Sequence, residues 1–268
     1  MRQSLAILRN PSQKIMITDT HTHLYAEEFD EDRPALISDA IHQGITRFFM
    51  PNIDSTSIGP MLELQQKYPE NCFPMMGLHP CSVKENYLEE IRKIEKTLMN
   101  GHFSAIGEIG IDLYWDKTFI NEQEEVFKLQ ADWAFQLNMP IAIHTRNSMV
   151  IVIDLLEKMK NRPSGIFHCF SATAEDAKRV VGLGFKLGIG GVVTFKNGGL
   201  TPVIEAIPLT EIVLETDAPY LAPAPHRGKR NIPSYIIEVL KKVAEIKGTS
   251  EIEVADITTK NSKNIFKQ

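Results

Sequence analysis

The sequence Ile15-Met-Ile-Thr-Asp-Thr-His-Thr-His23 opens with a short apolar run and closes on two histidines in alternation. Residues two apart on an extended strand point to the same face, so we expect His21 and His23 to hold their imidazole rings side by side. Two such rings make half of a metal site. An isolated His-x-His pair can equally be two packed surface or core residues, so the interpretation depends on partners elsewhere in the chain.

The rest of the chain alternates short apolar runs rich in Val, Ile and Phe with longer segments of helical periodicity. We count eight such strand and helix units. The clearest helix is predicted at residues 119–138, another is expected to begin at Pro233, and a last short helix is expected at residues 251–266. The eight candidate strands are predicted to end near Asp19, Met50, Gly77, Gly107, His144, His168, Ile189 and Glu215.

Eight units fit a (β/α)8 barrel, which typically takes about 250 residues, although a doubly wound open sheet alternates in the same way. No Gly-x-Gly-x-x-Gly sequence follows the first strand, as a dinucleotide-binding sheet would require. Ionisable residues instead lie at the carboxyl ends of strands 1, 4, 5, 6 and 8, where a barrel gathers its active site. The sequence therefore predicts a single-domain α/β protein, a (β/α)8 TIM barrel over residues 16–268. Residues 1–15 are expected to form an N-terminal extension, either poorly ordered or produced by a misplaced start.

The composition is that of a globular protein with a full hydrophobic core. The 268 residues are 43% hydrophobic and 24% charged, with a net charge of −5, so any nucleic-acid contact must be local. The three cysteines form no Cys-x-x-Cys pair, which favours a reducing compartment. Neither a signal-peptide core nor a run of 18 apolar residues is present. We therefore expect a cytoplasmic protein with no membrane segment.

Ionisable residues directly follow the apolar part of four further strands. Glu108, His144 and His168 end strands 4, 5 and 6, and Asp217 follows strand 8. Together with the first two histidines, these side chains are enough for two divalent ions with open positions for water and substrate. Imidazole and carboxylate ligands suit Zn, Mn, Ni or Fe better than Ca, and Mg is kept as a further candidate because ligand type alone does not identify the ion.

Two divalent ions facing two carboxylates would leave this mouth of the barrel net positive, which favours an anionic substrate such as a phosphodiester. The ions would lower the pKa of a bound water toward ~7 and neutralise charge on phosphoryl oxygens. The loop Arg227-Gly-Lys-Arg230 offers further cations to a phosphate backbone. The pattern thus points to a metal-dependent hydrolase.

These motifs resemble those of the TatD family of metal-dependent deoxyribonucleases, a branch of the amidohydrolase-like barrels, from about Ile17 to Phe266. The resemblance rests on Asp19-Thr-His-Thr-His23, Gly107-Glu-Ile-Gly-Ile-Asp112, His168-Cys-Phe-Ser171, Glu215-Thr-Asp-Ala-Pro-Tyr-Leu221 and Arg227-Gly-Lys-Arg-Asn231. It implies hydrolysis of DNA, as single strands or ends and often from the 3′ end, with Glu108 and Asp217 as catalytic residues and Asp217 activating the attacking water. The metal ligands that it implies are His21, His23, Glu108, His144, His168 and Asp217.

Further residues are expected to bind substrate or to support the ligands. The expected substrate contacts are His79, Arg146, Arg227, Lys229 and Arg230. Three carboxylates are expected to hold the imidazole rings from behind, namely Asp19, Asp112 and Glu215, although the first two could equally cap turns. The chain departs from the family at Cys81, where a second histidine is usual, at Ala172, where glycine is usual, and at Ile232, where glutamate is usual.

Two other functions fit the same ligand set. One is hydrolysis of an amide, lactone or ester of a small metabolite, and the other is a non-catalytic barrel that keeps metal as a structural element. The basic loop favours the nuclease over the first, and the intact ligand set argues against the second. Trp115 and Trp133 are expected to pack in the core or at the rim rather than to stack on bases.

Overall fold

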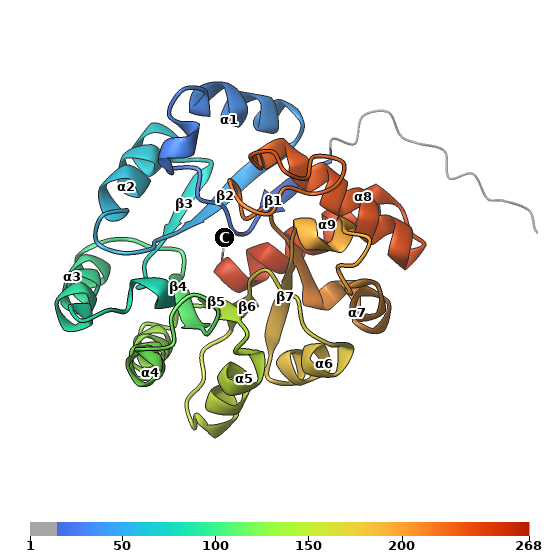
Figure 1. Cartoon of the computed structure of the whole chain (residues 1–268). Helices are drawn as coiled ribbons and strands as arrows, with labels where there is room; N and C mark the ends of the chain where they lie inside the picture. The colour runs from blue at the N-terminus through green and yellow to red at the C-terminus, as the bar shows by residue number, and fades with distance from the viewer. Residues whose placement is uncertain (1–14, 268) are drawn as a thin grey trace, which may run out of the picture.

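The computed structural model describes residues 15–267, so the predicted extension, residues 1–15, lies outside the described residues apart from Ile15. Within this range, strands form a central ring and helices α1 to α8 surround it in chain order (Figure 1). The strands are β1 (Ile17–Asp19), β2 (Ile45–Pro51), β3 (Cys72–Met75), β4 (Ile106–Asp112), β5 (Ile141–Arg146), β6 (Gly165–Phe167), β7 (Phe185–Ile189) and β8 (Ile212–Leu214).

In residues 15–267 none of the helices is long and apolar enough to cross a membrane. They are α1 (Arg33–His42), α2 (Ile58–Lys67), α3 (Tyr87–Asn100), α4 (Ile120–Gln136), α5 (Met149–Lys158), α6 (Ala174–Gly182), α7 (Thr201–Ala206), α8 (Ile236–Lys247) and α9 (Glu251–Phe266). Short 3₁₀ helices lie in the loops: η1 (Glu27–Phe29), η2 (Pro80–Ser82), η3 (Gly191–Thr194), η4 (Leu209–Glu211) and η5 (Pro233–Tyr235).

All paired strands are parallel, in the orders β1-β2-β3 and β4-β5-β6-β7-β8. Backbone hydrogen bonds cross both breaks between these two sets. Met76 N donates to Ala105 O at 3.1 Å beside β4, and Thr20 N donates to Leu214 O at 3.0 Å at the end of β8. The eight strands therefore form the predicted (β/α)8 barrel.

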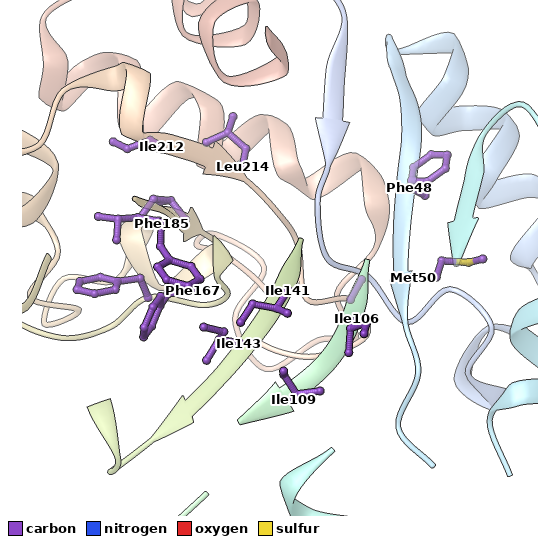
Figure 2. Close-up of a cluster of buried hydrophobic side chains, with 14 of the residues drawn as sticks. Phe48, Met50, Ile106, Ile109, Ile141, Ile143, Phe167, Phe185, Ile212 and Leu214 are labelled. Carbon is purple, nitrogen blue, oxygen red and sulfur yellow. The ribbon is translucent and has the colours of Figure 1, made fainter. Parts of the chain in front are cut away.

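Two apolar clusters hold the barrel together. In the larger one, strand side chains such as Ile141, Ile143 and Phe167 pack with the surrounding helices (Figure 2). The smaller cluster includes Ala142 and Ile166, which alternate with those residues along the strands, and Phe266 of α9. Helix α9 therefore packs its last turn against the apolar inner side chains of the strands, which leaves the carboxyl end of the barrel for polar groups.

Strand alternation explains why the polar residues gather at that end. Residues two apart on a strand share a face, so His144 follows Ala142 on the inner face of the barrel. His168 follows Ile166 in the same way, just after β6 ends. Along each of these strands, the inward-facing residues therefore change from apolar to polar within two residues.

The predicted end of the first strand at Asp19 is confirmed, but His21 and His23, which were expected on an extended strand, lie in the loop after it. One predicted strand end needs correction. Strand β4 continues past the predicted end at Gly107 to Asp112, because it stays paired with β5 as far as Asp112 opposite Arg146.

Candidate metal centre

Glu108 lies among imidazole rings at the carboxyl end of the barrel. Its Oε1 is 2.9 Å from His144 Nδ1 and 3.1 Å from His168 Nε2. Its Oε2 is 3.0 Å from His21 Nε2 and 3.8 Å from His23 Nε2. Burial alone would raise the pKa of Glu108, but the neighbouring histidines, His168 first, lower this pKa well below its ordinary value. The carboxylate is therefore ionised, and each of its oxygens faces a different pair of histidines.

Asp217 lies on the side of His21 and His23. Its Oδ1 is 3.8 Å from His21 Nε2 and 3.6 Å from His23 Nε2. The residue has φ +58°, a left-handed conformation that aspartate tolerates better than most residues. Its backbone N donates to His21 O at 2.9 Å, and its carbonyl accepts from Tyr220 N at 2.8 Å. These bonds hold the carboxylate toward the two histidines.

A hydrogen-bonded chain sets the tautomer of His23. Tyr25 donates its hydroxyl proton to Pro51 O at 2.5 Å, so the phenol oxygen is free to accept. His23 Nδ1 lies 2.9 Å from that oxygen and is therefore the protonated nitrogen. The lone pair on His23 Nε2 then faces Asp217 and Glu108, as a metal ligand requires.

Carboxylates also orient the imidazole rings of His168 and His144. His168 Nδ1 lies 3.1 Å from Glu215 Oε1, which leaves His168 Nε2, facing Glu108, as the nitrogen available to an ion. His144 Nε2 lies 2.9 Å from Asp112 Oδ2, which leaves His144 Nδ1 toward Glu108. Asp112 and Glu215 thus stand where carboxylates that orient ligating histidines are found.

Within residues 15–267 neither ring nitrogen of His21 makes a well-aligned hydrogen bond, although the side chain is fully buried and Nε2 lies 3.0 Å from Glu108 Oε2. Its ring stacks on that of His168 at 3.6 Å between centroids. Burial, with His168 as the next cause, lowers the pKa of His21, so the ring is neutral and carries a lone pair. A buried polar atom without a partner requires an explanation, and a metal ion supplies one.

The donor groups overlap in one centre. Within the described part of the chain, ligand atoms lie within 4.8 Å of one another in three sets: His21, His168 and Asp217; His21, His23 and Glu108; and His79, Glu108 and His144. The sets share members, and they bring together the six residues predicted as ligands. Imidazoles with buried carboxylates fit a divalent ion.

Comparison with known proteins shows the family of the chain. A family model described as TatD related DNase matches residues 18–267. The chain belongs to the TatD family. It is 37% identical over 254 residues to the uncharacterized metal-dependent hydrolase YabD of Bacillus subtilis, with 94% of this chain and 99% of the relative covered. It is 33% identical over 192 residues to the uncharacterized metal-dependent hydrolase YcfH of Escherichia coli, with 71% and 72% covered.

Solved structures confirm the fold. The crystal structure of YJJV, a TatD homologue from Escherichia coli, matches with a TM-score of 0.89 at 25% identity and covers 96% of this chain and 100% of its own. This TatD protein therefore has the barrel fold and belongs to a family of metal-dependent hydrolases, as the resemblance predicted.

His79 differs from the other histidines of the TatD centre. The backbone N of Cys81 donates to His79 Nδ1 at 3.0 Å, so the neutral ring carries its proton on Nε2, 3.5 Å from Glu108 Oε1. The loop is held by Gln130, whose Oε1 accepts from Leu78 N at 2.7 Å. His79 is thus set up as a hydrogen-bond donor, in keeping with its predicted contact to substrate. Cys81 contributes through its backbone at the position where the family usually has histidine.

Asp19 supports the site differently from the prediction. Its carboxylate accepts from the Thr216 hydroxyl at 2.6 Å, from Thr216 N at 2.9 Å and from His21 N at 3.3 Å, and so contacts no imidazole ring. The reason is that His21 lies beyond the end of β1, where its backbone rather than its ring passes Asp19. Asp19 therefore fixes the path of the ligand-bearing loops.

Arg230 also needs correction as a predicted substrate contact. Its guanidinium pairs with Asp32 at 2.5 Å, donates to the carbonyl of Glu28 and lies over the ring of Phe29. These partners tie the loop after β8 to the start of α1 and engage Nη1 and Nη2 in contacts within the chain. Arg227 and Lys229 in the same loop are exposed, with Arg227 lying 4.0 Å from the centroid of the Phe195 ring.

Several residues that support the site were missed by the sequence analysis. Tyr25 continues the alternation of His21 and His23, a signal that could have revealed it. Gly188 in β7 gave no signal, yet a Cβ at this position would lie 2.2 Å from Glu215 Oε2. This glycine makes the room that the carboxylate behind His168 occupies.

Proposed function

We propose that this TatD protein hydrolyses phosphodiester bonds in DNA, acting on single strands or ends as a 3′–5′ exonuclease with two divalent ions. The observation that supports the proposal is the position of Glu108, whose two oxygens face separate pairs of histidines. One ion would be held by Glu108, His21, His23 and Asp217, and the other by Glu108, His144 and His168. A carboxylate shared in this way is typical of two-metal hydrolases.

The residues of the chain have separate tasks in this scheme. Divalent ions, when bound, would make the attacking water more acidic and neutralise charge on the phosphoryl group. Asp217 would accept the proton of that water through a carboxylate oxygen. His79 would donate from Nε2 to a non-bridging phosphoryl oxygen, because its other nitrogen is engaged by the backbone of Cys81.

The cations around the mouth explain how a protein with a net charge of −5 could bind a polyanion. Arg146, Arg227 and Lys229 are exposed. Their local field would act against the negative charge of the rest of the surface and attract the phosphates that flank the reacting one.

The test combines metal analysis with a substrate panel. The metal-free protein is reconstituted separately with Mn²⁺, Mg²⁺, Zn²⁺ and Ni²⁺, bound metal is counted, and hydrolysis is measured on single-stranded DNA, duplex DNA, RNA and small esters. We expect two ions per chain and loss of nucleotides from the 3′ end of single-stranded DNA. Hydrolysis of small esters or amides without hydrolysis of DNA would overturn the proposal in favour of a metabolite hydrolase, and no turnover with any ion in favour of a structural metal.

A further inference from the structure

The loop that follows β4 exposes two aromatic rings beside the metal centre. Trp115 is 69% exposed and Tyr114 is 53% exposed, whereas Trp133, the other tryptophan, is 6% exposed. The two rings meet edge to face with their centroids 5.0 Å apart. Trp133 is buried as expected, but Trp115 does not pack in the core, and so much exposed aromatic surface calls for a partner.

Asp112 connects these rings to a predicted metal ligand. Its Oδ2 accepts from His144 Nε2 at 2.9 Å, while its Oδ1 accepts from Tyr114 N at 2.9 Å and from Trp115 N at 3.1 Å. The same carboxylate therefore orients an imidazole of the centre and holds the backbone of the aromatic loop. Because its own backbone N donates to the buried Gln123 Oε1 at 2.9 Å, Asp112 is itself fixed.

Arg146 adds a cation to the aromatic pair. It lies two residues after His144, with its guanidinium carbon 3.9 Å from the Tyr114 ring centroid and 5.3 Å from that of Trp115. Within residues 15–267 its guanidinium has no ion pair. Stacking on the rings therefore holds the charge in place while its donors stay available for a phosphate.

A cavity of about 590 Å³ adjoins this group of residues. It lies between the loops after β5 and β6, the strands that lead to His144 and His168. Its lining includes Tyr114, Arg146, Ser148, Val150, Ser171 and Ala172. The cavity thus lies between Tyr114 of the aromatic loop and the segments that follow His144 and His168, and it is large enough for a nucleotide.

We propose that Trp115 and Tyr114 form a stacking subsite for an unpaired nucleobase, and that Arg146 binds a phosphate of the same nucleotide. The inference rests on the proposed function and deepens it, because it explains how one strand of DNA is held next to the reacting phosphate. Aromatic rings beside a cation bind single strands without sequence preference, since every base has a π face. Bases within a duplex are already stacked, so the subsite selects unpaired nucleotides.

The test measures binding without hydrolysis. A short oligothymidylate with phosphorothioate linkages is added to the full-length protein in Ca²⁺, and tryptophan fluorescence is recorded. Trp115 is exposed and Trp133 is buried, so stacking should quench Trp115 and leave a constant background from Trp133. In parallel, the affinity for a labelled copy of the same oligonucleotide is measured by anisotropy for the wild type, Trp115→Ala and the control Phe135→Ala, which removes an exposed aromatic ring from α4.

We expect Trp115→Ala to weaken binding about tenfold or more, the usual effect of losing one base-stacking ring, and Phe135→Ala to have no effect. A second oligonucleotide with abasic sites should bind the wild type and Trp115→Ala equally, because it keeps the phosphates and lacks the bases. Unchanged fluorescence at saturating oligonucleotide, or an equal loss of affinity for both oligonucleotides, would overturn the subsite. Since hydrolysis is not measured, failure of the proposed nuclease activity would be seen separately, in the substrate panel.

Discussion

The backbone N of Asp217 donates to the carbonyl of His21 at 2.9 Å, and a second bond runs from His23 N to Ala218 O at 2.7 Å. These bonds join the loop after β1 to the loop after β8, the first and last strands of the barrel. The distance between the first histidines and the last carboxylate is therefore set by closure of the barrel. Substitutions that disturb these contacts between the first and last loops should reduce both metal affinity and stability.

Asp217→Asn tests the proposed proton acceptor. The amide has the same shape but cannot take a proton from water, so we expect the turnover of DNA to fall by at least roughly 10²-fold with the fold retained. Turnover, metal content and thermal unfolding are measured on one sample. Asp132→Asn, at an exposed position of α4, is the matched control. Near-normal turnover by a folded, metal-loaded variant would remove Asp217 from the proton transfer.

Tyr25→Phe tests the hydrogen-bonded chain behind His23. The variant keeps the ring and loses the oxygen that accepts from His23 Nδ1, so the ring is no longer held in the ligating tautomer. We expect metal affinity to fall by about 10- to 100-fold, the usual effect of removing such a partner. Titration calorimetry with Mn²⁺ gives the affinity, and Tyr87→Phe, at the start of α3, is the control. Equal affinities in all three proteins would contradict this role of Tyr25.

Gly188→Ala tests the space reserved for Glu215. The added Cβ would lie 2.2 Å from Glu215 Oε2, so the carboxylate must move away from His168 Nδ1. We expect a loss of about 1–3 kcal/mol in the free energy of unfolding, as for other overpacked cores, together with weaker metal binding. Gly182→Ala is the control, because a Cβ there meets nothing within 4 Å. A Gly188→Ala protein as stable as the control would show that Glu215 can shift without cost.

The fold and the clustering of the six candidate ligands could be predicted because both depend on local patterns. The alternation that puts Ala142 inside the barrel also puts His144 inside, two residues later. Contacts between the start and the end of the chain give no such pattern in the sequence. Asp19 contacts Thr216, and Arg230 contacts Asp32, only once the barrel closes and the first and last strands are neighbours. The exposure of Trp115 could not be predicted either, because a tryptophan in a sequence is more often buried.

Glu90→Gln tests a buried carboxylate away from the metal centre. Glu90 accepts from Ser55 N, from the Ser55 hydroxyl and from Lys93 Nζ, each at 3.0 Å. Burial would raise the pKa of Glu90, but these hydrogen bonds lower it below the ordinary 4.5. A lowered folded-state pKa means that the stabilisation is present above about pH 4.5 and is lost as the pH falls through the folded value.

We therefore expect metal-free wild type to be more stable than metal-free Glu90→Gln at pH 7, with a difference that shrinks below pH 4.5. Thermal unfolding from pH 7 to pH 3 measures this difference. Glu89→Gln should match the wild type throughout, because the Glu89 side chain pairs with Lys93 while 69% exposed. If the difference in stability between the wild type and Glu90→Gln does not change with pH, the substitution acts through packing and not through ionisation of the carboxyl group.

Addition and removal of metal test the number of sites through stability. The two buried ring nitrogens of His21 make no well-aligned hydrogen bond in residues 15–267, so the native state gains a partner for one of them when an ion binds and the unfolded state does not. One site filled at 100 times its dissociation constant adds about 2.7 kcal/mol, which for a chain of this size raises the melting temperature by about 5–10 °C. Two sites should produce two separate increases in melting temperature as Mn²⁺ is added to metal-free protein.

His21→Ala should remove one of these increases and lower the stoichiometry from two ions to one, while His42→Ala, at an exposed position of α1, should keep both. Two ions bound by folded His21→Ala would exclude this histidine as an essential ligand, and a single increase in the wild type would reduce the centre to one ion.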